Sequence, residues 1–460
     1  MSGLFQALQT TSNTLDAFSK SIETEGLNVA NASSPGWAAL NVTIRPIGSS
    51  GAGSDVVDIS STSDTRADAV VRSATSEASF SQTASSQVTP INQFFDITGA
   101  SGILGALRNF STAFSQLAVN PSDSGLRLAS IDAARSVALS FNQVAASLDD
   151  AQSQADTAVQ STVGQINSLS STIAGYNAQL RGSAAFDPQL DANLRNALDS
   201  LSSLINITTS TNKDGTVTVL AGGSLPLVSE DHTWPVGVNT AAAPGSQLVS
   251  SAGGVAPTKI LGSLGGLLDF RNNVTGALLG GNGQAGSLNT LAAGFASRVN
   301  ALLISGTTDA GTPGAPLFTF DQTDPSNVAR TLAIDPSVGT ADLGLASATQ
   351  SNGIANSLAN LSTSTQTADQ ITLGQTSQAA EGLFASIAAG IGQRTSDLAS
   401  SAQLDASAQT SAETSRQNVS GVSLDKEAVQ LTAGQRAYEA VARLFTTLDT
   451  LTETEVNLIK

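Results

Sequence analysis

The two ends of the chain carry the same pattern of apolar positions, spaced alternately by three and four residues. Near the N-terminus it comprises Leu4, Leu8, Leu15, Phe18 and Ile22, with Thr11 as a polar interruption. Near the C-terminus it comprises Leu431, Gly434, Tyr438, Val441, Phe445 and Leu448, and Leu451, Leu458 and Ile459 extend it with a shift in phase. This spacing predicts two helices, each with a heptad seam. We expect them to pack on each other or on neighbouring copies, and to become ordered on assembly. An ordinary globular domain that ends in two docked helices fits the pattern equally well.

The chain between these ends reads mostly as helices, with β structure at mid-chain. The first helix should run to about residue 30, ended by Gly26 or by the Asn31–Pro35–Gly36 region. Further helices are predicted over 66–88, 104–117, 128–148, 159–180, 190–204, 261–279, 288–304 and 350–418. Alternating residues predict strands over 41–47 and 56–59 around a loop at 48–53, a hairpin over 205–220 that turns at Lys213-Asp214-Gly215, and short strands at 317–320 and 331–334.

These elements predict a mainly α fold with inserted β structure (α+β) in several domains. The helices should form an elongated bundle built from both halves of the chain. We expect residues 1–45 and 420–460 to form a terminal coiled-coil domain, and 46–204 and 259–419 to form a helical rod, with loops and strands at about 306–345. Residues 205–258 should form a β-rich inserted domain.

Composition narrows the range of possible functions. The formal charge is −17 and no cluster of Lys or Arg occurs, so nucleic acid is a poor partner. With no cysteine and a single histidine, thiolate metal sites and most imidazole chemistry are excluded. No run of 18 apolar residues and no secretory signal pattern is present, so we expect no membrane insertion, and either a cytosolic location or export by another route.

Three short patterns could carry chemistry, and we expect none of them to do so. Gly281-Asn282-Gly283-Gln284-Ala285-Gly286 matches a dinucleotide-binding fingerprint, but a helical pattern precedes it instead of a strand. His232 lacks a second His or Cys and should lie in a surface turn, and Asp149-Asp150 should lie on a solvated helix face. We therefore predict no catalytic residue, no cofactor and no metal. Trp37 is either an anchor between subunits or a turn residue that covers its own chain.

Two motifs carry a resemblance to a known family. Asn28-Val29-Ala30-Asn31 with Pro35-Gly36-Trp37 resembles the signature that follows the first helix in bacterial flagellar axial proteins, the rod, hook and junction group. Ser420-Gly421-Val422-Ser423-Leu424-Asp425-Lys426-Glu427 is similar to the C-terminal signature of the flagellar hook-associated protein 1 family, which forms the hook–filament junction. Segments with further similarity are Phe94-Phe95, Asn120-Pro121 with Arg127, Gly265 to Arg271, Leu288 to Asn300 and Leu317-Phe318. The departures are Trp37 where Tyr is common, Ala38-Ala39 where Thr-Arg often follows, and Lys426 where a second acid is usual.

The resemblance implies a structural subunit and not an enzyme. Such proteins are exported unfolded by the flagellar type III apparatus, after a transient stay in the cytoplasm, and polymerise outside the cell at the distal end of the hook. The implied partners are further copies in a ring, the hook protein, a second hook–filament junction protein, and an export chaperone that would cover Tyr438, Val441, Phe445 and Leu448. The alternatives are the hook protein or another axial protein, and a secreted hydrolase or binding protein with helical stalks, which would need a convergent polar pocket.

Overall fold

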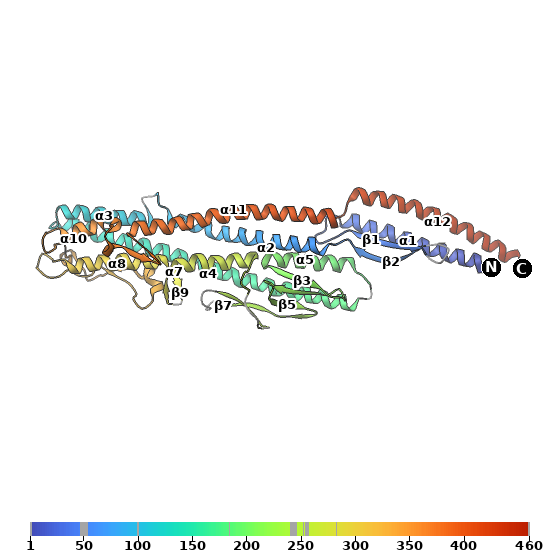
Figure 1. Cartoon of the computed structure of the whole chain (residues 1–460), viewed down its shortest axis with the longest axis horizontal. Helices are drawn as coiled ribbons and strands as arrows, with labels where there is room; N and C mark the ends of the chain where they lie inside the picture. The colour runs from blue at the N-terminus through green and yellow to red at the C-terminus, as the bar shows by residue number, and fades with distance from the viewer. Residues whose placement is uncertain are drawn as a thin grey trace.

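The computed structural model describes residues 2–46, 54–98, 101–183, 185–239, 246–251, 253, 257–281 and 283–458. Figure 1 shows a long helical rod with a separate helix pair at the end that carries both chain termini. The β structure of mid-chain lies along one side of the rod. The predicted mainly α fold with inserted β structure is confirmed. The predicted loop at 48–53 lies outside the described residues.

The helix pair is formed by α1 (Ser2–Asn31) and α12 (Leu424–Leu458). A twisted hairpin of β1 (Leu40–Pro46) and β2 (Ser54–Ser61) packs against α1, with a bulge between Thr43 and Ile44. Gly26 lies inside α1, so the first helix ends at the Asn31 turn and not at this glycine. We refer to α1 and α12 together as the terminal pair.

Long helices from both halves of the chain make the rod. They are α2 (Thr65–Val88), α3 (Gly102–Val119), α4 (Ser124–Gly182), α5 (Pro188–Leu204) and α11 (Ala380–Ser420). Asp64, Asp123 and Asp187 cap the N-termini of α2, α4 and α5 by accepting backbone N–H bonds. The separate helices predicted over 128–148 and 159–180 are wrong, because α4 runs unbroken through both. The polar stretch between them contains neither Gly nor Pro, so nothing interrupts the helix.

Two glycines near the start of the predicted 261–279 helix lie in close contact with neighbouring backbone. The predicted 261–279 helix consists of α6 (Gly262–Asp269), a π-helical segment η2 (Phe270–Thr275) and α7 (Gly276–Leu279). A Cβ at Gly265 would lie 2.3 Å from the Ile260 carbonyl oxygen, and one at Gly266 would lie 2.7 Å from the Phe80 carbonyl oxygen on α2. These contacts give the Gly265-Gly266 pair a packing role. The helix α8 (Ser287–Ser305) follows, close to the predicted 288–304.

The mid-chain β structure shares its core with the rod. The strands are β3 (Ile207–Thr211), β4 (Val217–Ala221), β5 (Leu225–Ser229), β6 (His232–Thr233), β7 (Val236–Asn239) and β8 (Gln247–Ser250). The first four form a sheet in sequential order, and β7 and β8 form a separate hairpin. The β3–β4 hairpin was predicted, with Gly215 at a φ of 81° in its turn. Val219 and Leu227 of the sheet are buried in one cluster with Ile166 of α4 and Leu201 of α5.

The predicted helix over 350–418 is wrong in its first half. That stretch holds the short α10 (Gly353–Asn360), the 3₁₀ turns η5 (Leu361–Thr363) and η6 (Thr367–Asp369), and a hairpin of β13 (Ile371–Leu373) and β14 (Thr376–Gln378) before α11 begins. Gly374, at a φ of 62°, turns the hairpin, and buried Ile371 packs over Gly294 of α8. The short strands predicted around 317–334 are present as β11 (Phe318–Thr319) and β12 (Ala333–Ile334).

The larger hydrophobic core fills the end of the rod far from the terminal pair. Phe110 lies 4.5 Å from Phe114 and 5.2 Å from Phe295, measured between ring centroids, and the three rings are fully buried. Arg127 ties the loops at this end together. Its Nε donates to the Pro121 carbonyl at 2.6 Å, and a terminal nitrogen pairs with Asp309 at 2.7 Å. The smaller elements are η1 (Thr89–Phe95), β9 (Gly280–Gly281), β10 (Gln284–Ala285), η3 (Pro325–Asn327), α9 (Val328–Thr331) and η4 (Thr340–Asp342).

Candidate functional site at the terminal pair

The two predicted seams meet in the terminal pair. α1 and α12 run antiparallel, with both chain ends at the same end of the molecule (Figure 1). A Cβ at Gly434 would lie 3.2 Å from Ile22 Cγ1, which marks a close crossing. Thr11 is buried, and the half-buried seam residues are Leu4, Leu8, Leu15, Phe18, Ile22, Leu431, Val441, Phe445 and Leu448. Tyr438 is 39% exposed, so this contact covers it only in part.

The terminal pair leaves much apolar surface uncovered. Leu451 was expected to extend the seam, but it is 52% exposed, and half-buried Thr452 and Glu455 continue the inner face instead. Leu444 is 53% exposed and Phe5 is 65% exposed. Among the described residues, none from α1 or α12 belongs to either hydrophobic core of the rod. Two helices alone can only half-bury their seam, so this pair gains little stability by itself.

Asn28, from the first family motif, joins the terminal pair to the start of the β hairpin. Its side-chain amide donates to the Leu40 carbonyl at 3.0 Å and to Glu427 Oε2 at 3.1 Å, and its Oδ1 accepts the Leu40 N–H at 2.8 Å. Trp37 Nε1 donates to the same Oδ1 at 3.4 Å. Asn28 and Glu427 are both buried. The amide therefore holds one residue from each end of the chain, and the Trp37 indole is engaged with its own subunit.

Gly36 lets the same motif pack closely against the rod. Its φ of 76° lies in the left-handed region, and a Cβ there would lie 2.4 Å from the Ala192 carbonyl oxygen on α5. Only glycine both adopts a positive φ without strain and leaves this space free of a Cβ. Asn31 closes the turn before it by accepting from Ser34 Oγ at 3.1 Å. Ala30 and Pro35 are exposed and make the turn without covering the core.

Ser420, from the second motif, ends α11 at the same joint. Its carbonyl accepts the Ala39 N–H at 2.9 Å, and its hydroxyl accepts the Asp64 N–H at 3.3 Å. Asp425 lies in the first turn of α12, where a carboxylate favours the helix dipole. Gly421 and Val422 form the connection, and the Leu424 side chain is exposed. The two motifs, from opposite ends of the sequence, thus build one joint between the terminal pair and the rod.

A buried charge cluster supports the joint from the rod side. Arg416 of α11 pairs with Asp199 of α5 at 2.6 Å, and Arg72 of α2 pairs with the same carboxylate at 3.0 Å. Burial raises the pKa of Asp68, which lies 3.6 Å from Arg416, and outweighs the opposing effect of Arg72 and the other nearby arginines. The cluster fixes three helices to one another below the motif turn. Sequence reasoning missed it, because its members lie far apart along the chain.

The patterns considered for chemistry have ordinary structural roles. Gly280–Gly281 and Gln284–Ala285 form a tiny hairpin after α7, so no strand precedes the glycine pattern as a dinucleotide site requires. The His232 side chain is 75% exposed beside Asp231, and Asp149 forms an exposed ion pair with Arg330. Among the described residues no group of three or more His, Cys, Asp or Glu could hold a metal ion. No helix in that part of the chain is long and apolar enough to cross a membrane.

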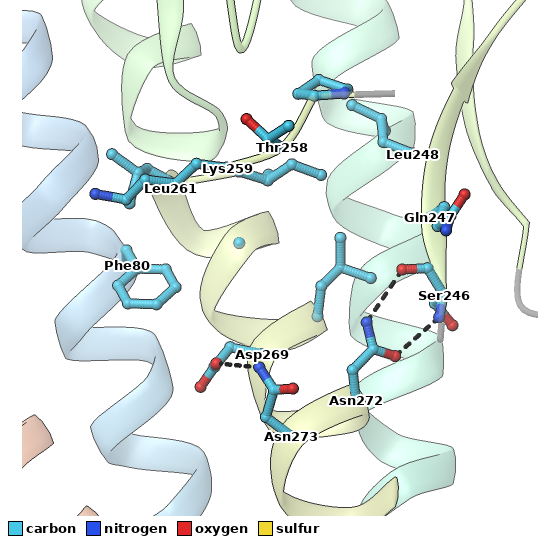
Figure 2. A pocket seen from close by; sticks show the side chains of 14 residues that line it. Phe80, Ser246, Gln247, Leu248, Thr258, Lys259, Leu261, Asp269, Asn272 and Asn273 are labelled. Atoms are coloured by element: carbon cyan, nitrogen blue, oxygen red, sulfur yellow. Dashed lines mark hydrogen bonds between the residues drawn. The ribbon is translucent and has the colours of Figure 1, made fainter. Parts of the chain in front are cut away.

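Figure 2 shows a pocket of about 640 Å³ that lies between α2, the start of β8 and α6. Several of its polar groups bind one another. Asn272 exchanges two hydrogen bonds with the backbone of Ser246, and Asp269 accepts from Asn273 (Figure 2). Asp269 also pairs with Arg394 of α11. A site for acid–base catalysis needs such groups aimed at a substrate. The two bonds of Asn272 instead hold the residue before β8 to η2 of the rod.

Comparison with known proteins places the chain in a class and then in a family. The C-terminal residues 414–458 match the model for the flagellar basal body rod FlgEFG protein C-terminal region. The end of α11 and the helix α12 are therefore similar to the C-terminal region of these rod proteins. Residues 88–318, half of the chain, match the flagellar hook-associated protein FlgK helical domain. The chain belongs to this FlgK family of flagellar hook-associated proteins.

Individual relatives agree with this family. The chain is 25% identical over 515 aligned residues to flagellar hook-associated protein 1 of Bacillus subtilis (strain 168), covering 99% of each chain. It is 27% identical to the protein of that name from Salmonella typhimurium over 48% of this chain and 41% of the relative. The solved structure of the flagellar hook junction protein FlgK from Burkholderia pseudomallei shares the fold, with a TM-score of 0.65 at 15% identity, over 76% of this chain and all of that one.

Proposed function

We propose that the chain is a structural subunit that self-assembles into a ring at the distal end of the hook and joins hook to filament. The observation that carries the proposal is the terminal pair, which holds the family motifs yet leaves an apolar face uncovered. Phe5, Leu444 and Leu451 have no place in the core of their own subunit. Burial against neighbouring copies would supply the stability that the isolated pair lacks. The assembly residues in this proposal are the seam residues of α1 and α12.

The further partners in this proposal are the hook protein, a second hook–filament junction protein and an export chaperone. Val441, Phe445 and Leu448 face α1, so a chaperone that covers them has to separate the terminal pair. A weakly held pair suits such a step, and it suits export in the unfolded state by the flagellar type III system. We infer a transient cytoplasmic stage, a final extracellular location and no enzymatic activity. The domain division proposed from the sequence, with the terminal pair as one unit and residues 205–258 as another, is retained as part of this proposal.

The alternative is a hook protein or another axial subunit, because the C-terminal match is to the basal-body rod type. Immunogold electron microscopy of isolated flagella distinguishes these, with an antibody raised against residues 205–239. The junction proposal requires a narrow band of label where hook meets filament. Label along the whole hook would support the hook alternative, and an unlabelled organelle would reject both.

A further inference from the structure

Both heptad seams end in a glutamate at the joint. Glu25 lies three residues after Ile22, and Glu427 lies four residues before Leu431, so each occupies the next seam position. The antiparallel packing of α1 and α12 brings the two carboxylates to the same end of the contact. Seam positions normally hold apolar side chains, and a pair of like charges there disfavours packing.

The contacts of the two carboxyl groups differ. Glu427 is buried, and its Oε2 accepts the Asn28 amide. Glu25 accepts a 3.3 Å bond from Ser21 at Oε1, whereas its Oε2 is buried without a hydrogen-bond partner in the described part of the chain. This oxygen lies over Gly434, at 4.0 Å from where a Cβ would stand. A buried, unpartnered carboxylate oxygen is costly when charged.

Nearby cations do not neutralise this pair. The other charged groups on the parts of α1, α12 and the β hairpin that meet at this end of the pair are exposed, namely Glu23 on α1, Asp425, Lys426 and Arg436 on α12, Arg45 on β1 and Asp58 on β2. None of the ion pairs found among the described residues includes Glu25 or Glu427, and Lys20 is paired with Asp16. Burial, and to a smaller extent the charge of Glu427, raises the pKa of Glu25 despite the opposing bond from Ser21.

We propose that Glu25, whose Oε2 is buried without a hydrogen-bond partner where α1 packs on α12, acts as a proton-dependent contact that tightens the terminal pair when protonated and loosens it when ionised. The neutral acid removes the repulsion and the desolvation cost of a buried charge. The ionised form keeps the pair easy to separate at neutral pH. This inference concerns the folding of the subunit and stands whether or not the proposed junction function is right.

The direction of the pH dependence follows from linkage. The folded pKa of Glu25 is raised above its ordinary value of 4.5, so the folded pair binds the proton more tightly than the unfolded chain does. Its contribution to stability is complete below that ordinary value and is lost as the pH rises through the raised pKa. Each unit by which the pKa is raised corresponds to about a tenfold change in the equilibrium between the packed and the separated terminal pair.

Hydrogen–deuterium exchange of the full-length free protein tests the proposal. We compare amide protection in α1 and α12 at about pH 5 and about pH 7.5, after correction for intrinsic exchange, with amides of α4 as an internal reference. We expect wild-type protection in the terminal pair to fall several-fold between these values. In Glu25→Gln the fall should disappear, and protection at neutral pH should exceed that of the wild type. Glu23→Gln, an exposed neighbour on the same helix, should retain the wild-type fall.

A second variant keeps the test decisive if the amide introduced by Glu25→Gln packs poorly. Glu427→Gln removes a nearby negative charge that disfavours ionisation of Glu25 while keeping an acceptor for Asn28, so the pH-dependent fall should shrink. Wild-type protection that does not change with pH would overturn the proposal. An undiminished fall in both Glu25→Gln and Glu427→Gln would also overturn it.

Discussion

The Asn28 amide donates to the Glu427 carboxylate across 399 residues of sequence, at 3.1 Å and out of contact with solvent. This bond joins the end of the first helix to the start of the last, so each motif supplies a buried hydrogen-bond partner to the other. The same amide exchanges two bonds with the backbone of Leu40, which sets where the β hairpin leaves the joint.

Removing the Asn28 side chain should loosen the joint. Asn28→Ala leaves the Leu40 backbone groups and the Glu427 carboxylate buried without partners, at about 1–3 kcal/mol for each unmade bond. We expect faster proteolysis near residues 31–40 and 420–423 and less amide protection in the terminal pair. Asn31→Ala is the matched control, because Asn31 only closes a local turn. Equal effects of the two substitutions would contradict the role given to Asn28.

A side chain at Gly36 should push the motif turn off α5. Gly36→Ala combines an unfavourable φ, costing about 1 kcal/mol or more, with a clash against the Ala192 carbonyl. Thermal unfolding should show a lower Tm for the variant. Gly26→Ala is the control, since a Cβ there meets nothing within 4 Å inside α1 and should stabilise that helix by about 0.5–1 kcal/mol. Similar Tm changes at both positions would show that Gly36 has no special contact.

Charges placed in the seam should block assembly without unfolding the rod. Leu15→Asp and Phe445→Asp put a carboxylate into the contact between α1 and α12, and neither residue belongs to the rod cores. We expect loss of incorporation into flagella, measured by immunoblot, and an unchanged unfolding transition of the rod. Leu15→Met, a volume-conserving change, should incorporate normally. Normal incorporation of either Asp variant would refute the assignment of the seam.

Substitution of Leu444 distinguishes contacts within a subunit from contacts between subunits. Because it is mostly exposed in the monomer, Leu444→Asp should change the free energy of unfolding by no more than about 0.5 kcal/mol. Its incorporation into flagella should nevertheless fall strongly, because the same position would be buried against a neighbouring copy. A variant that incorporates like the wild type would mean that this face stays exposed in the assembly.

The sequence predicts the parts of this molecule that depend on local periodicity. The seams at both ends, the β3–β4 hairpin and the helical rod follow from spacing and turn residues alone. Periodicity alone does not mark α4 as one helix, because its apolar stripe is interrupted at 149–158, and only the absence of Gly and Pro there indicates that the helix can continue. It also missed the β13–β14 hairpin, whose Ile371 is buried only because α8 presents a glycine to it.

The joint was only partly predictable. Asn28, Gly36 and Ser420 stand out as members of motifs, but their shared contacts depend on residues from both ends of the chain. Glu427 also belongs to the second motif, and it continues the C-terminal seam with an acid where an apolar residue is expected. The charge cluster of Arg416, Asp199 and Arg72 offers no such signal, since three separate helices contribute to it.

The central claim, that terminal pairs of neighbouring copies pack on one another, is tested most directly by thiol crosslinking. The chain has no cysteine of its own, so Leu444→Cys, Leu451→Cys and Phe5→Cys each introduce a unique thiol on the uncovered face. His232→Cys, on the exposed β structure, is the control. Treatment of intact flagella with a bifunctional maleimide, which can bridge equivalent thiols that do not touch, should give covalent dimers for terminal-pair positions and few for the control, while the free protein gives none. Absence of dimers at all three positions in flagella that contain the variants would contradict the account.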